Sequence, residues 1–196
     1  MHLLIATRNP DKLKEIRSVF AAPGLTFSSA LDHPEVPDVV EDGTTAEENS
    51  SKKALTLARE TGHWALADDT SLEDDALDGA PGIYAARYAG EDATYEDTVR
   101  KLLHELLGLP GRGAAFRTVI TLSDPSGGIR HADGQIRGCI TESPRGEGGF
   151  GYDPVFVPDG HDRTFAEMPL DLKNRISHRA RALRHALQLW RDLLLD

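Results

Sequence analysis

Two adjacent carboxylates, Asp68 and Asp69, directly follow a short apolar run, 64–67, that is expected to form a strand. Carboxylates at the end of a strand can hold Mg²⁺, which takes oxygen ligands, and one of them can deprotonate a water molecule. Exposed turns also contain paired aspartates, so the pair alone leaves both interpretations open. Glu41 precedes a predicted helix. An acid at that place interacts favourably with the helix dipole, which is enough to explain Glu41 without a role in chemistry. Lys53 lies further along that helix, on what is most often a solvated face.

A phosphate site is possible at the turn that follows the first apolar run of the chain. The run ends at Thr7, and Asn9-Pro10 then supplies a favoured helix N-cap and a favoured first helical residue. A strand-to-helix turn directs backbone N–H groups and the positive end of the helix dipole at an anion. Thr7, Asn9 and Lys12 would add side-chain donors, although the G-K-[ST] ending of the Walker loop is absent. A capped helix with a solvated lysine is the alternative interpretation.

Two further groups of residues could surround a flat ligand. A stretch with four glycines encloses Phe150, which could stack on a base, and is followed by Asp153, which could accept hydrogen bonds. A flexible hairpin loop explains the same composition. Lys173, His178 and Arg179 stand at the start of the last predicted helix, where basic residues are mildly unfavourable for the helix dipole. That placement favours a ligand or an acidic partner nearby.

The elements that must position these residues alternate between strands and helices. Apolar periodicity and caps predict strands at 3–7, 64–67, 116–122, up to about 141, and 155–157. They predict helices from 10, over 44–62 with a Thr44/Glu47 capping box, over 94–107, and from 174 onward. This mixture indicates an α/β or α+β domain with a mixed sheet flanked by helices.

Composition limits the class of protein. Of the 196 residues 39% are hydrophobic and 28% are charged, as in ordinary globular domains. The single cysteine, Cys139, excludes an internal disulfide and is expected to be a core or strand residue. A net charge of −10 argues against a nucleic-acid partner. The N-terminal apolar run is too short for a signal peptide or a membrane span, so a cytoplasmic protein is expected.

Seven short segments occur in a fixed order along the chain: Leu4-Ile5-Ala6-Thr7-Arg8-Asn9 with Lys12, Glu47-Glu48-Asn49 with Lys53-Ala54, Ala67-Asp68-Asp69-Thr70, Gly79-Ala80-Pro81-Gly82-Ile83-Tyr84, Ala86-Arg87-Tyr88, Gly149-Phe150-Gly151-Tyr152-Asp153-Pro154 and Ile176-Ser177-His178-Arg179. Through them nearly the whole chain resembles the inosine triphosphate pyrophosphatase family. The sixth segment and the serine-histidine-arginine run are specific to that family.

The resemblance implies an α/β fold with an elongated mixed β-sheet flanked by helices, in one domain over 1–196 that has two lobes and a central cleft. It also implies a homodimer that uses Mg²⁺ to hydrolyse ITP, dITP and XTP to the monophosphate and pyrophosphate. Such an enzyme keeps deaminated purines out of DNA and RNA.

The resemblance also assigns roles by position. The residues that would hold the triphosphate are Thr7, Arg8, Asn9, Pro10, Asp11, Lys12 and Lys53. Asp69 would be the general base and a metal ligand, with Glu41 as a second metal-associated acid and Thr70 in contact with the substrate. The residues that would surround the base are Phe150, Gly151, Tyr152, Asp153, Lys173, His178 and Arg179.

Two positions depart from the family pattern. Arg8 stands where the family usually has glycine, so it would add a phosphate contact, or obstruct the turn if positive φ is needed there. Thr70-Ser71 replaces serine-glycine, which keeps the hydroxyl group but loses the freedom of glycine. These departures suggest an alternative, a non-catalytic protein that binds or senses purine nucleotides. A related pyrophosphatase for modified pyrimidines is disfavoured because it would lack the Ser177-His178-Arg179 contacts.

Overall fold

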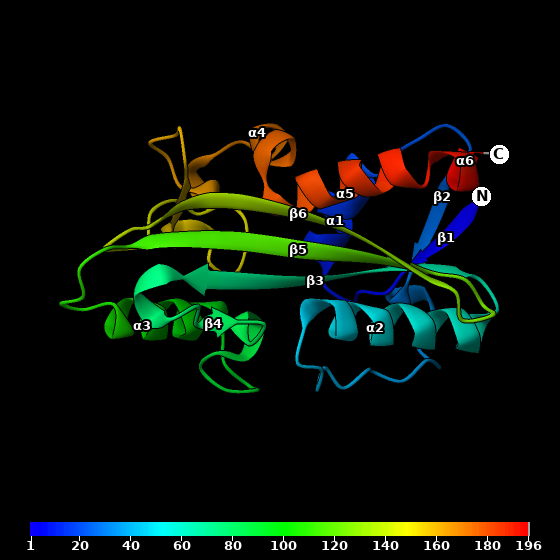
Figure 1. Ribbon diagram of the computed structural model, residues 1–196, viewed down its shortest axis with the longest axis horizontal. Coiled ribbons are helices and arrows are strands. Elements are labelled where there is room, and N and C mark those ends of the chain that lie inside the picture. Colours follow the sequence, from blue (N-terminus) through cyan, green and yellow to red (C-terminus); the bar gives the residue numbers. More distant parts are fainter. Residues whose placement is uncertain (196) are drawn as a thin grey trace. The chain divides into compact units, whose positions relative to one another are not determined.

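The computed structural model describes residues 1–195 (Figure 1). Its strands are β1 (His2–Ile5), β2 (Thr26–Ser29), β3 (Trp64–Asp74), β4 (Pro81–Gly82), β5 (Gly113–Ser123), β6 (Ile129–Ile140) and β7 (Phe156–Pro158). Its α-helices are α1 (Pro10–Val19), α2 (Ala46–Thr61), α3 (Tyr95–Glu105), α4 (Leu170–Ile176), α5 (His178–Leu189) and α6 (Arg191–Leu195).

The strands of residues 1–195 form one seven-stranded sheet in the order β2-β1-β3-β5-β6-β7, and β4 pairs with β3. β1 is parallel to β2 and β3, whereas the β3–β4 and β6–β7 pairs are antiparallel. The predicted mixed sheet flanked by helices is therefore confirmed. The chain divides into two compact units: unit 1 holds 1–69, 118–134 and the residues from 179 onward, and unit 2 holds 70–117 and 135–178. The expected cleft stays a prediction.

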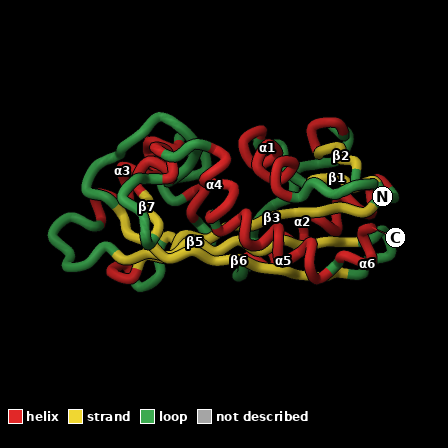
Figure 2. Tube along the Cα trace, turned by 90° about the horizontal axis from the view of Figure 1, so that it is seen from above, coloured by secondary structure: helices red, strands yellow, loops and turns green. Residues whose placement is uncertain are grey.

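In unit 1 the sheet is covered on both faces because successive strand residues point to opposite sides. Leu3 and Ile5 of β1 pack in one apolar cluster with residues of α1 and α5, whereas Leu4 packs in another with residues of α2. Figure 1 shows α2 and α5 on opposite faces of the sheet. β1 and β2 lie side by side near the N-terminus (Figure 2), with His2 opposite Thr26.

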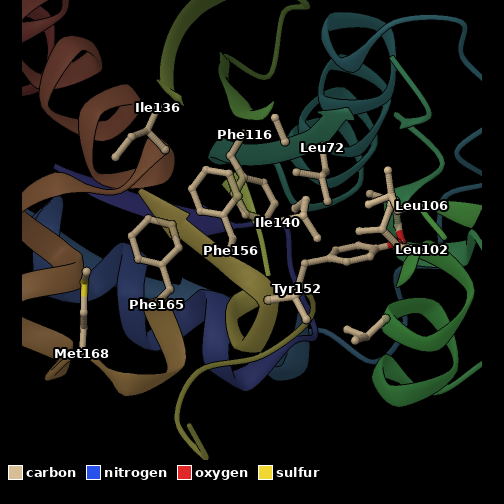
Figure 3. Close-up of a cluster of buried hydrophobic side chains, with 14 residues drawn as sticks. Leu72, Leu102, Leu106, Phe116, Ile136, Ile140, Tyr152, Phe156, Phe165 and Met168 are labelled. Atoms are coloured by element: carbon tan, nitrogen blue, oxygen red, sulfur yellow. The ribbon is translucent and has the colours of Figure 1, made fainter. Parts of the chain in front are cut away.

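Unit 2 has its own aromatic core (Figure 3). The ring of Phe116 in β5 lies 4.7 Å from that of Phe156 in β7, measured between centroids. Leu102 of α3 is fully buried in the same cluster. The hydroxyl group of buried Tyr152 donates a 2.8 Å hydrogen bond to the carbonyl of Ala85, which ties the glycine-rich segment to this core.

The predicted helix boundaries hold best where caps are strong. Asn9 caps α1 by accepting from the backbone N–H groups of Asp11 and Lys12, and Gly62 ends α2 in the left-handed conformation at φ 70°. The N-cap of α2 was predicted one residue too early: the capping side chain is Thr45, which accepts from the N–H of Glu48. Adjacent threonines offer the same cap chemistry, so the sequence alone does not separate them.

Two predictions were wrong in detail. β3 runs on to Asp74 instead of stopping at Ala67, because each of its buried polar residues has at least one partner for its side chain; these residues are Asp68, Asp69, Ser71 and Asp74. The last helix is broken at Ser177, whose extended backbone (φ −63°, ψ 158°) separates α4 from α5. The prediction that Cys139 is a core or strand residue is confirmed: it lies on the exposed face of β6, and the residues on either side of it point to the opposite face.

Candidate active site

Asp68 and Asp69 lie within β3 and their side chains point to opposite faces of the sheet, as the strand pleat requires. Asp68 is on the side of α1 and α5, where it contacts Lys12 and Arg179. Asp69 is on the side of α2, where it contacts Lys53. The two neighbouring acids therefore occupy different electrostatic environments.

Asp69 belongs to a partly compensated group of charges. The Nζ atom of Lys53 lies 3.3 Å from Oδ1 of Asp69 and 3.2 Å from Oε1 of Glu41. Oδ2 of Asp69 is buried and has no hydrogen-bond partner among residues 1–195. Burial, assisted by the negative charge of Glu41 and only partly opposed by Lys53, raises the pKa of Asp69 to about 6. Burial acts on Glu41 too, but Lys53 and Lys12 outweigh it and lower the pKa of Glu41.

Asp68 belongs to a fully compensated network. Its Oδ2 accepts from Nε and Nη2 of Arg179 at 3.1 and 3.0 Å, and Nη1 of Arg179 donates to Glu15 at 2.6 Å. The Nζ atom of Lys12 lies 3.3 Å from the same oxygen of Asp68. Burial alone would raise the pKa of Asp68, but Lys12 and Arg179 outweigh it and hold that pKa well below its usual range.

The turn between β1 and α1 has the predicted capped geometry. The N–H of Asn9 donates to Oγ1 of Thr7 at 3.1 Å, and Oδ1 of Asn9 accepts from the N–H groups of Asp11 and Lys12 at 2.9 and 3.3 Å. Pro10 is the first helical residue. Lys12, through its ion pair with Asp68, joins this turn to β3. Anion binding at the turn stays a prediction.

Arg8 does not obstruct this turn. Asp78 is the one non-glycine residue with positive φ in the described chain, so Arg8 adopts ordinary backbone geometry. Its guanidinium group bonds to Asp38 and to the carbonyls of Ala30 and Val36. The side chain is thus bonded to the segment 30–38.

In unit 2 the glycine-rich segment is fastened by a buried ion pair. The Nζ atom of Lys173 lies 2.5 Å from Oδ2 of Asp153, and the N–H of Phe150 donates to that oxygen at 2.9 Å. Lys173 also lies 4.7 Å from the centre of the Phe150 ring. Gly149 has φ 70°, and a Cβ atom there would stand 2.0 Å from Oδ2 of Asp153, so this position requires glycine.

His178 and Arg179, which are also predicted to bind the base, contact different parts of the chain. His178 stacks on Phe116 in unit 2 with ring centroids 4.4 Å apart, and both side chains are buried. Arg179, the next residue, is bonded to Asp68 and Glu15 in unit 1. Its position in this structure is thus in the charge network, and a contact with the base stays a prediction. Thr70 is half-buried beside Asp69, and Gly151 takes φ 60°.

A model of the Ham1 family matches residues 3–189. The chain belongs to the Ham1 family. A dITP/XTP pyrophosphatase of Geobacter sulfurreducens is 50% identical over 92% of both chains, and one of Desulforamulus reducens is 44% identical over 100% of this chain and 98% of its own. The family resemblance read from the motifs is therefore confirmed.

Solved structures of Ham1 proteins share the fold. A HAM1 protein from Coxiella burnetii superimposes with a TM-score of 0.89 at 36% identity, covering 98% of this chain and 99% of its own. The Ham1 protein of Staphylococcus aureus gives a TM-score of 0.86 at 36% identity, covering 98% of each chain. In this Ham1-family chain, none of the helices within residues 1–195 is long and apolar enough to cross a membrane.

The carboxylate oxygens at the site indicate whether it suits a divalent cation. Within the described chain no three histidine, cysteine, aspartate or glutamate side chains converge as a ready-made metal cluster. Glu41 and Asp69 nevertheless meet at Lys53, and Oδ2 of Asp69 is a buried carboxylate oxygen without a partner in the described residues. Buried polar atoms are rarely left unpaired, and hard cations prefer such oxygens. The two carboxylates therefore fit a cation that takes its other ligands from water or phosphate.

One member of the charge network was not predicted from the sequence. Glu15 was not singled out, although it follows Lys12 by three residues on the same helix and precedes the buried Ile16. That spacing places it beside Lys12 and was the available signal. Asp68 was considered only together with Asp69, because its partner Arg179 is 111 residues away in the sequence.

Proposed function

We propose that this protein hydrolyses dITP, XTP and ITP to the nucleoside monophosphate and pyrophosphate. The observation that carries the proposal is the buried carboxylate of Asp69, which lies beside Lys53 and Glu41 and has a pKa raised to about 6. A base with a pKa just below neutrality is mostly ionised at neutral pH and still accepts a proton readily. The named activity of the relatives that match over more than nine-tenths of the chain supports the same reaction.

In the proposed reaction a water molecule attacks the α-phosphorus in line with the leaving pyrophosphate. The carboxylate of Asp69 orients this water and accepts its proton, while the bond from the α-phosphorus to the bridging oxygen breaks. Lys53 offsets negative charge next to the carboxylate, and Thr7 together with residues Asn9 to Lys12 binds the triphosphate. A divalent cation held by Glu41 and Asp69, which we propose to be Mg²⁺, would neutralise charge on the phosphate oxygens.

The base would be recognised by the residues around the Asp153–Lys173 pair. Phe150 offers a ring to stack on, and the donor to the 6-oxo group of hypoxanthine or xanthine would be His178 or Arg179, although Arg179 is bonded to Asp68 and Glu15 in this structure. Adenine presents a 6-amino donor there, which would leave a buried donor unpaired at a cost of about 1–3 kcal/mol, or one to two decades of discrimination. Guanine has the 6-oxo group as well, so it must be rejected through its 2-amino group.

We also propose an oligomeric state and a cellular location. We propose a single domain over 1–196 with two lobes, a homodimer, and a cytoplasmic protein that acts on free nucleotides without a nucleic-acid or membrane partner. The net charge of −10 supports the absence of a nucleic-acid partner, since surfaces that bind phosphate backbones are basic.

The test is a substrate panel of dITP, ITP, XTP, ATP and GTP, with and without Mg²⁺. Phosphate is measured by malachite green before and after addition of inorganic pyrophosphatase. We expect signal from dITP, ITP and XTP only after that addition, and much less from ATP and GTP. Tight binding of dITP without turnover of any triphosphate would refute the enzyme and favour the nucleotide-sensing alternative.

A further inference from the structure

The side chain of Arg8 makes three contacts with one segment of the chain. Nη1 donates to the carbonyl of Ala30 at 2.7 Å, Nη2 donates to the carbonyl of Val36 at 2.6 Å, and Nε donates to Asp38 at 2.6 Å. The planar guanidinium group suits this task because its donors are fixed in a fork. A phosphate ligand would have to compete with these short hydrogen bonds.

The segment that Arg8 holds leads directly to Glu41. After the short 3-10 helix Ala30–Asp32, residues 33–45 contain no helix or strand. Val36 is buried in the apolar cluster under α2, and Glu41 follows Asp38 by three residues. An irregular segment of this length has many conformations in the absence of fixed contacts. The position of the Glu41 carboxylate therefore depends on what anchors the segment.

A second anchor lies on the other side of Glu41. The N–H of Gly43 donates to Oδ1 of Asn49 at 2.8 Å, and Asn49 is completely buried. The approach is so close that a Cβ atom on Gly43 would stand 2.6 Å from Oδ1 of Asn49 and 2.8 Å from Cβ of Glu48. Glu41 is thus held between the Arg8 contacts on its N-terminal side and the Asn49 contact on its C-terminal side.

We propose that Arg8 is a positioning residue: it fastens the segment 30–38 so that Glu41 is presented to Lys53 and Asp69, and it does not bind the triphosphate. Arg8 thereby makes a fixed contact with the segment that carries the second acid. The predicted effect of Arg8 on turnover rests on the proposed function. Its predicted effect on the backbone order of residues 33–43 does not.

The proposal is tested on the full chain with Arg8→Lys, which keeps the charge but cannot make the forked contact. Gly43→Ala disturbs the second anchor, and Arg100→Lys is the control, because Arg100 is exposed and pairs with Asp97 across one turn of α3. Backbone hydrogen exchange is followed by mass spectrometry without nucleotide. We expect exchange of residues 33–43 to be roughly tenfold faster in Arg8→Lys and in Gly43→Ala, and unchanged in Arg100→Lys.

The same variants are assayed for Mn²⁺ affinity by calorimetry and for dITP turnover. We expect Arg8→Lys to lower kcat and Mn²⁺ affinity by roughly 10–100-fold, as when a residue that orients a metal ligand is changed, with the KM for dITP unchanged. A raised KM with normal kcat and normal exchange would show that Arg8 binds phosphate and would overturn the proposal. Unaltered exchange in Arg8→Lys would also overturn it. If the unsubstituted protein turned over no nucleotide, the proposed function would fail, and the exchange result would still decide the role of Arg8.

Discussion

The ammonium nitrogen of Lys53 lies 3.3 Å from Oδ1 of Asp69, while Oδ2 of the same carboxylate is buried and has no hydrogen-bond partner in the described part of the chain. The positive charge of Lys53 therefore lies beside only one of the two carboxylate oxygens of Asp69. Lys53 also pairs with Glu41. A carboxylate in this condition binds protons and cations more readily than a surface aspartate. Asp68, by contrast, is paired with both Lys12 and Arg179.

Asp69→Asn is expected to abolish pyrophosphate release and to stabilise the fold at neutral pH. Because burial raises the pKa of Asp69 from 3.8 to about 6, the folded protein holds this proton more tightly than the unfolded chain. The ionised group therefore opposes folding above about pH 6, and the effect disappears below about pH 4. The gain for the variant is at most about 3 kcal/mol, since one pKa unit corresponds to about 1.4 kcal/mol.

Urea unfolding without metal checks this linkage at about pH 8 and about pH 4. We expect the variant to be the more stable protein at the higher pH and to match the unsubstituted protein at the lower pH. A free energy difference of the same size at both pH values would show that Asp69 does not have a raised pKa.

The neighbouring carboxylates are expected to titrate separately. Asp69 should show an inflection near pH 6, whereas Asp68 should stay ionised below the ordinary aspartate pKa of about 3.9, because Lys12 and Arg179 outweigh its burial. The measurement is a ¹³C titration of the side-chain carboxyl carbons, with Asp69→Asn used for assignment. Inflections of both residues near the ordinary value would contradict the two environments described for β3.

Removal of Arg179 is expected to damage the fold. Arg179→Met would leave Asp68 and Glu15 as buried negative charges, and breaking such a network costs about 3–5 kcal/mol. The control is Arg184→Met on the same helix, where the side chain is exposed. Urea unfolding should separate the two variants clearly, and Glu15→Gln should restore part of the loss in the Arg179→Met background. Equal, small losses in both single variants would rule out a structural role for the network.

Gly149→Ala is expected to disrupt the proposed base site. A Cβ atom there would stand 2.0 Å from Oδ2 of Asp153, the oxygen that binds Lys173 and the N–H of Phe150. Gly160→Ala is a matched control, because Gly160 also has positive φ (80°) but no atom of the described chain lies within 4 Å of the added methyl group. The KM for dITP should rise much more in Gly149→Ala than in Gly160→Ala. The same small change in both would mean that the Asp153 contact does not shape the site.

Local signals predicted the fold well where they were strong. Asn9-Pro10 and Gly62 fixed two helix ends because caps act within a few residues. β3 was predicted too short, since Asp68 and Asp69 appear as a turn unless their distant partners are known. Those partners lie on α5 and α2, and their contacts depend on tertiary packing that no local pattern contains.

The candidate site was predicted in composition but not in arrangement. The ordered motifs identified the family and named Glu41, Lys53 and Asp69, which the structure brings together in unit 1. They did not reveal that Arg8 turns toward the segment 30–38, because that segment has no periodicity from which a contact could be inferred. The helix break at Ser177 likewise has no glycine or proline signal.

The most direct test of the proposed reaction is hydrolysis of dITP in ¹⁸O-labelled water, with both products analysed by mass spectrometry. Attack of an Asp69-activated water on the α-phosphorus predicts one ¹⁸O atom in the monophosphate, none in pyrophosphate, and equal amounts of the two products. Asp69→Asn should form neither product. Label in pyrophosphate, or release of inorganic phosphate with the diphosphate, would place the attack at another phosphorus and contradict the account.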